Sequence, residues 1–148
     1  MIEHLARRRN ARGQFGFARE AKALLPARED LLLAKSHRGL HLLGREERSL
    51  RVPVCVLEAT YGPNVVIRPH GLGEPVIEAR IGLERCHLAQ VRSALRRRGA
   101  NPSEEYNGAH YCVLRFEASP DDMLGLPVEL AELTAGRLSH QILLTGYR

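Results

Sequence analysis

The clearest hydrophobic pattern lies near the end of the chain. Leu126, Leu130 and Leu133 recur at helical spacing. Pro127 suits the first turn of a helix, because the N–H group that proline lacks has no partner there. Gly136 follows where a left-handed residue would end the helix, and apolar and polar positions then alternate with a period of two. The pattern predicts a helix that leads directly into a final strand.

The preceding residues, from 74 to 122, show alternating patterns and one helical pattern. An Asn107-Gly108 pair marks a tight hairpin, because both residues tolerate the positive φ that such turns require. The expected inward positions are Ile77, Ala79 and Ile81 in a strand, Leu88, Val91 and Leu95 in a helix of about 86–98, and Cys112, Leu114 and Phe116 in a later strand. Residues 74–148 therefore predict an α+β domain in the order β-α-β-β-α-β, the ferredoxin-like two-layer arrangement.

Residues 1–30 carry a cluster of arginines followed by Gln14-Phe15-Gly16-Phe17 and a short helical pattern. This segment is predicted to be a basic arm or linker exposed to solvent. The alternative is an arm that folds or docks on RNA, as arginine-rich segments do.

Residues 31–73 contain short apolar segments and are predicted to form a smaller α/β unit. Val52–Ala59 and Val65–Ile67 are expected to pair as a hairpin, because Gly, Pro and Asn cluster between two β-branched runs. His37, His41 and His70 also lie in this unit. Metal binding would need further ligands that cannot be placed, so surface or capping roles are preferred for these histidines.

The C-terminal pattern resembles the fifth domain of elongation factor G and its relatives, the ribosome-binding GTPases of translation. The matching residues are Met123, Gly125, Leu130, Leu133, Thr134, Gly136, Arg137, Ser139 and Tyr147. Glu74-Pro75 and the Arg97-Arg98-Gly99 helix end also fit that domain, so the resemblance covers 74–147. Leu126 and His140 depart from it, since the family usually has an aromatic and an apolar residue there.

Two weaker resemblances concern the first half. Leu40-His41-Leu42 and Pro63-x-Val65-x-Ile67-Arg68 resemble the third domain of the same family, although Arg38 replaces a glycine and 45–50 is short and charged for the expected helix. Arg12–Gly16 looks like the opening of the fourth domain. The third domain precedes the fourth in the family, so both assignments cannot hold, and the third-domain-like one is preferred.

The resemblance implies a non-catalytic, C-terminal portion of a translational GTPase that binds the ribosome and its RNA. A phosphate-binding Gly-x-x-x-x-Gly-Lys-(Ser/Thr) loop is absent, and Lys22 and Lys35 are the only lysines. The GTPase domain, with its GTP and Mg²⁺, is therefore expected outside this chain, in the same or a neighbouring polypeptide. No cofactor is expected within the chain itself.

Charge is unevenly distributed. Residues 1–73 contain 13 Lys and Arg against 7 Asp and Glu, whereas residues 74–148 contain 9 against 10. In the second half the predicted helix carries a row of arginines that suits bidentate contact with phosphates, although it could equally be a hydrated surface. The candidate RNA-binding residues are Arg92, Arg96, Arg97 and Arg98 on this helix, together with Arg137.

Other chemistry is sparse. Cys55, Cys86 and Cys112 do not suggest a disulfide framework or a zinc site, and Cys86 and His87 are expected to point apart because they are adjacent. No active site or metal site is predicted, and no signal peptide or membrane span, so the expected location is the cytoplasm. The alternative function is a stand-alone ferredoxin-like regulatory or dimerisation domain that binds a small molecule or a partner protein. An enzyme ranks third.

Overall fold

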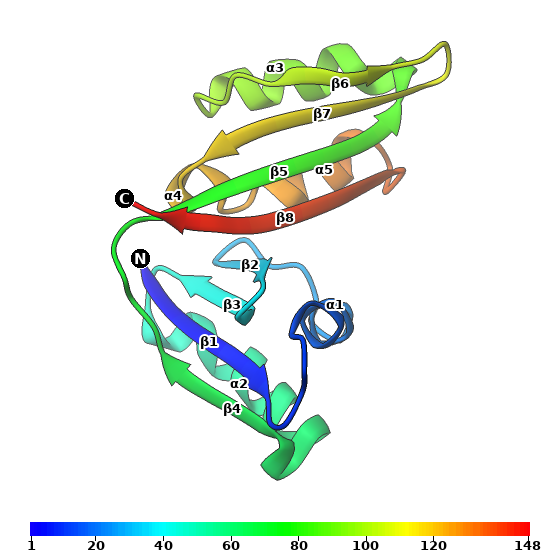
Figure 1. The fold of residues 1–148 in the computed structure, drawn as a ribbon. Helices are drawn as coiled ribbons and strands as arrows, with labels where there is room; N and C mark the ends of the chain where they lie inside the picture. The colour runs from blue at the N-terminus through cyan, green and yellow to red at the C-terminus, as the bar shows by residue number, and fades with distance from the viewer.

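Two successive runs of strands and helices build the α+β fold in the computed structural model, which describes residues 1–148 (Figure 1). The first run comprises β1 (Ile2–Arg8), α1 (Phe15–Ala23), β2 (Leu31–Ser36), β3 (Gly39–Gly44), α2 (Glu47–Tyr61), the short turn η1 (Gly62–Asn64) and β4 (Val65–Pro69). The second comprises β5 (Pro75–Glu84), the short turn η2 (Arg85–His87), α3 (Leu88–Arg97), β6 (Ser103–Asn107), β7 (Tyr111–Ala118), α4 (Pro120–Met123), α5 (Leu126–Leu133) and β8 (Leu138–Tyr147). We call these runs the first half and the second half.

All eight strands belong to one sheet, in the order β4-β1-β3-β2-β8-β5-β7-β6. Within each half every neighbouring pair is antiparallel. The halves meet where β2 and β8 run parallel, and only one pair of partners, Lys35 and Leu143, is formed there. We call this junction the seam. The eight strands therefore form one sheet, but a single pair of residues joins its two halves at the centre.

Two hydrophobic cores share the strand β2. Leu31 and Leu33 belong to a core with residues of α1 and α2, whereas Leu32 and Ala34 belong to a core formed mainly by the second half. Successive side chains of a strand point to opposite faces, so the two cores lie on opposite faces of β2. The helices of the first half therefore lie on one face of its sheet, and on the other face Leu32, Ala34 and Leu43 join the core that contains residues of α4 and α5.

The predicted pattern of the second half agrees with the structure. Residues 75–147 form strands and helices in the order β-α-β-β-α-β, with the short α4 added before α5. The positions predicted to face inward are buried, except that Leu88 and Leu133 are half-buried. Gly99 and Gly136 both have positive φ just beyond the helix ends, as expected of residues that terminate helices.

The prediction of an arm or linker for residues 1–30 was wrong, because this segment forms β1 and α1. β1 lies between β3 and β4 and buries Glu3, Leu5 and Ala6. Side chains on both faces of this strand are buried, so it lacks the alternation by which a half-exposed strand is recognised. The small α/β unit predicted for 31–73 is therefore the larger part of a unit that begins at residue 2.

The predicted hairpin of 52–59 with 65–67 is also absent. Residues 52–59 lie within the helix α2, and only 65–67 form a strand. Val52, Val54 and Val56 gave this segment a strand-like composition, but the buried positions are Ser49, Leu50, Pro53 and Leu57, which follow helical spacing. Tertiary packing of that stripe outweighs the β-propensity of the valines. No helix of the structure has the length and apolar character needed to cross a membrane.

A basic pocket as the candidate functional site

Four of the five predicted RNA-binding arginines are paired with carboxylates of the same chain. Arg92 pairs with Glu104, Arg97 and Arg98 both pair with Glu129, and Arg137 lies 3.6 Å from Glu84. Only Arg96 forms no salt bridge. These carboxylates come from β5, β6 and α5. The spacing of the arginines within α3 does not show which residues of other elements lie beside them.

Arg98 has a structural position. Its Nη1 donates to the backbone oxygen of Leu124 at 2.6 Å, and its Nη2 donates to Glu129 at 2.8 Å. It therefore ties the end of α3 to the connection between α4 and α5. A guanidinium held by this many partners is poorly available to a phosphate.

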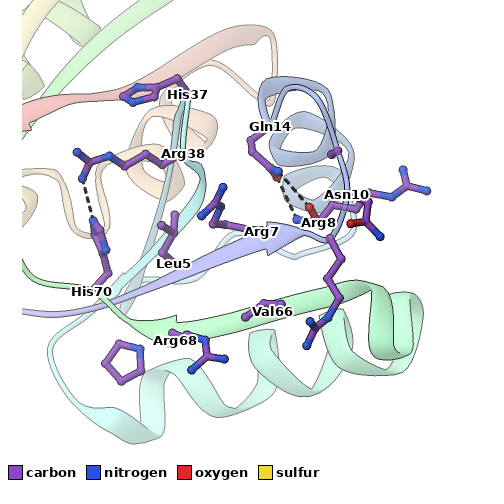
Figure 2. A pocket seen from close by; sticks show the side chains of 13 residues that line it. Leu5, Arg7, Arg8, Asn10, Gln14, His37, Arg38, Val66, Arg68 and His70 are labelled. Carbon is purple, nitrogen blue, oxygen red and sulfur yellow. Dashed lines mark hydrogen bonds between the residues drawn. The ribbon is translucent and has the colours of Figure 1, made fainter.

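The structure gathers a different set of arginines in a pocket of about 640 Å³ in the first half, which we call the basic pocket (Figure 2). Its lining residues are Leu5, Arg7, Arg8, Arg9, Asn10, Ala11, Gln14, His37, Arg38, Val66, Arg68, Pro69 and His70. They include five arginines and two histidines but neither aspartate nor glutamate. None of these five arginines forms a salt bridge.

Strand register places the centre of the basic pocket on the face of the first-half sheet opposite to α1 and α2. Leu5 is opposite Arg68 and Arg7 is opposite Val66 in the antiparallel pair of β1 and β4, so all four side chains share one face. Ala6 points to the other face, where it joins the core with α1 and α2. Arg7 of β1 and Arg68 of β4 are thus presented side by side on that face.

The loop between β1 and α1 forms one wall of the pocket. Gln14 is buried, its side-chain oxygen accepts from the backbone N–H of Arg8 at 3.0 Å, and its amide donates to the Arg8 carbonyl at 3.1 Å (Figure 2). Within the loop, Asn10 adopts a left-handed φ of 59°, which asparagine tolerates better than most residues. These features fix the course of the chain that carries Arg9.

The β2–β3 hairpin forms another wall. It carries His37 and Arg38, and the Arg38 guanidinium lies 3.3 Å from Nε2 of His70 (Figure 2). Burial lowers the pKa of His70, the neighbouring His41 and Arg38 side chains lower it further, and Glu3 opposes them. The neutral imidazole is thus favoured, which allows Nε2 to accept from Arg38.

A buried chain of polar groups lies beside this hairpin. Ser36 Oγ is 2.5 Å from His41 Nε2, and His41 Nδ1 is 2.6 Å from Glu3 Oε2, which also accepts from the Tyr147 hydroxyl at 2.6 Å. This order of hydroxyl, imidazole and carboxylate is that of a catalytic triad. Ser36 is only 5% exposed, however, and its Oγ already accepts from the backbone N–H of Arg38. We therefore assign these hydrogen-bonded side chains a structural role, which is to hold the β2–β3 hairpin in place.

A second group of polar side chains lies at the β5–α3 junction. Glu84, Cys86 and His87 place one possible ligand atom each within 4.8 Å of the others. The expectation that Cys86 and His87 point apart was wrong, because the two residues lie on the turn η2 instead of a regular helix or strand. Glu84 is also the partner of Arg137, so a metal ion would compete with that ion pair.

The sequence carried only a partial signal for the basic pocket. The excess of positive charge in residues 1–73 indicated the half of the chain that contains the basic pocket, but it did not show that Arg7, Arg38 and Arg68 lie close together. Their convergence depends on the pairing of β1 with β4 and on the β2–β3 hairpin. No protein-family model and no curated protein matches the sequence.

Proposed function

We propose that the chain is a non-catalytic RNA-binding module that contacts phosphates through the basic pocket. The observation that carries the proposal is one pocket lined by five arginines, none with a carboxylate partner, and by no acidic residue. Guanidinium groups bind phosphate oxygens in a bidentate geometry, and phosphate contacts supply most of the affinity when nucleic acids are bound without sequence preference. A polyanion would relieve the mutual repulsion of these arginines.

The composition of the pocket defines the mode of binding. No Phe, Tyr or Trp belongs to the lining, so the stacking of bases on aromatic rings that many single-strand binders use is not available here. Affinity would come from the phosphates, with strong salt dependence and little preference for sequence. The pocket is a shallow site on a sheet, which suits an extended single strand.

Ribosomal RNA is the RNA class that the sequence favours. The resemblance of 74–147 to the fifth domain of elongation factor G supports it, as does the strand-helix-strand order of 39–69, which agrees with a third-domain-like unit. We infer that each half is a ferredoxin-like unit, because its strands follow the order 4-1-3-2. In this proposal a GTPase domain of the same or a neighbouring polypeptide supplies nucleotide hydrolysis, and the present chain supplies the contact with RNA in the cytoplasm.

The proposal is tested with the double variant Arg7→Ala/Arg68→Ala and a single-stranded RNA 20-mer, by fluorescence anisotropy between 50 and 200 mM salt. Both side chains are exposed and neither forms a salt bridge, so the fold should be unaffected. We expect weaker binding, and a salt slope that is smaller by about 0.7 for each phosphate that the variant no longer binds.

The matched control is Arg92→Ala/Arg96→Ala on α3, which removes the same charge from the surface that the sequence pattern favoured. It should bind the RNA nearly as the parent does. If the α3 variant loses affinity and the pocket variant does not, RNA binds to α3 and the proposal is wrong. Sedimentation of both variants with ribosomes under the same conditions then tests whether ribosomal RNA is the target.

A further inference from the structure

A second pocket, of about 480 Å³, opens at the seam between the two halves. α1, the connection after it and β2 line it from the first half, and Pro127, His140 and Ile142 line it from the second. It lies beside the single pair of Lys35 with Leu143, where β2 and β8 stop following one another. We call it the seam pocket.

The charged groups of the seam pocket are all basic. Lys22 of α1 and Lys35 of β2, the only lysines in the chain, both line it, with Arg19, Arg28 and His140. Arg28 is paired with Asp30 at 3.2 Å, but Lys22, Lys35, Arg19 and His140 have no salt bridge. No Asp or Glu belongs to the lining. Lys22, Lys35 and Arg19 are thus brought together without a carboxylate partner.

The titration of these groups reflects that environment. Burial, with a smaller contribution from Lys35, lowers the pKa of Lys22 to about 8. Burial, with the charges of Lys22 and Lys35, lowers the pKa of His140 to about 4. A bound anion would reverse these effects, because it favours the charged form of each group.

The remaining wall of the pocket is apolar. Half of its lining residues are hydrophobic, among them Leu25, Leu31, Leu33 and Ile142. A bare inorganic anion would gain nothing from these side chains, whereas an apolar body placed against them would be removed from water. The pocket also falls within the size range of ordinary small-molecule sites.

We propose that the seam pocket binds a small amphipathic anion, whose acidic group lies between Lys22 and Lys35 and whose apolar body packs on Leu25 and Leu33 of the first half and on Ile142 of β8. Such a ligand would contact both halves and would strengthen a junction that contains only one strand pair. This site is separate from the basic pocket, and the proposal does not depend on RNA binding.

The test uses 8-anilinonaphthalene-1-sulfonate, a sulfonate with an aromatic body, whose fluorescence rises in apolar sites. We expect octanoate to displace it and 1-octanol, of the same chain length but uncharged, to displace it much less. Inorganic phosphate alone should not compete. Equal displacement by octanoate and octanol would show an unspecific apolar surface and would overturn the proposal.

The variant Lys22→Met keeps the aliphatic stem and removes the charge. We expect the dissociation constant of the probe to rise roughly tenfold, as is typical when one charged hydrogen bond is removed. The control Arg51→Ala, on the exposed side of α2, should change nothing. An unchanged dissociation constant in Lys22→Met would contradict the assigned position of the anion.

The pH dependence gives an independent measurement. Lys22 is mainly protonated at pH 7 and mainly neutral at pH 9, so the parent should bind the sulfonate more tightly at pH 7. His140 stays neutral across this range and does not contribute. Lys22→Met should lose most of this difference, and a difference that persists unchanged would count against the proposal.

A variant that fills the seam pocket tests binding without unfolding the protein. Ala27 lines the pocket and is exposed, so Ala27→Trp can fill the space without disturbing either core. We expect loss of probe binding with an unchanged circular dichroism spectrum and thermal midpoint. Retained binding in this folded variant would place the probe elsewhere and overturn the proposal. RNA binding should be normal in both variants.

Discussion

Replacing His41 with leucine is expected to lower the free energy of unfolding by about 3 kcal/mol, because it leaves the buried Glu3 carboxylate without one of its two hydrogen-bond partners. His41 is fully buried and Glu3 is 7% exposed, so water cannot take the place of the imidazole. One oxygen of Glu3 already has no hydrogen-bond partner, and the other would retain only the Tyr147 hydroxyl. Leucine avoids a large cavity, so the decrease in stability measures the polar interaction. Urea denaturation followed by circular dichroism is the measurement.

Two controls separate the loss of the polar interaction from the change in side-chain shape. The double variant Glu3→Leu/His41→Leu removes both partners, and we expect it to recover a large part of the stability, because replacing both partners of a buried hydrogen bond by apolar groups is often nearly neutral. Tyr147→Phe removes only one hydrogen bond and should cost about 1 kcal/mol. If His41→Leu is as stable as the parent protein, the buried interaction of His41 with Glu3 does not stabilise the fold.

Gly39→Ala is expected to destabilise the protein by about 2 to 5 kcal/mol, the sum of backbone strain and overpacking. Gly39 has a φ of +143°, which residues with a side chain rarely adopt. A Cβ atom at this position would also lie 2.2 Å from the backbone oxygen of Ala6. Backbone of β1 or β3 would have to move, because that oxygen belongs to a strand in the centre of the first half.

The matched control is Gly16→Ala in α1, where a Cβ atom would meet nothing within 4 Å. Alanine favours a helix over glycine, so this variant should be more stable by up to about 1 kcal/mol. Urea denaturation of both variants distinguishes the positions. A destabilisation of Gly16→Ala equal to that of Gly39→Ala would mean that close packing against β1 is not the cause.

The second half could be predicted from the sequence because its elements are exposed on one side. Ile77, Ala79 and Ile81 alternate with polar residues, and Val91 and Leu95 follow helical spacing, so each periodicity was visible. The strand β3 shows why the first half was harder. All six of its residues are buried, and a strand buried on both faces has no period to detect.

The candidate site was less predictable than the fold, because it depends on pairings between distant segments. Arg92 lies on the polar side of α3, as its spacing indicated, but it is half-buried and Glu104 from a later strand neutralises it. Arg7 and Arg68 are 61 positions apart, and only the register of β1 with β4 places them on one face. Local spacing can identify the face of a helix, but it cannot show which arginines lack a carboxylate.

The shared core has a consequence for biosynthesis. Leu32, Ala34 and Leu43 of the first half belong to a core that the second half completes, and Glu3 bonds to Tyr147, 144 residues later. Domains generally fold as units during synthesis, beginning from the N-terminus. While the ribosome is still making the second half, the nascent first half has these three apolar side chains uncovered and Glu3 without its phenol. Its folding is therefore completed only when β8 has left the exit tunnel.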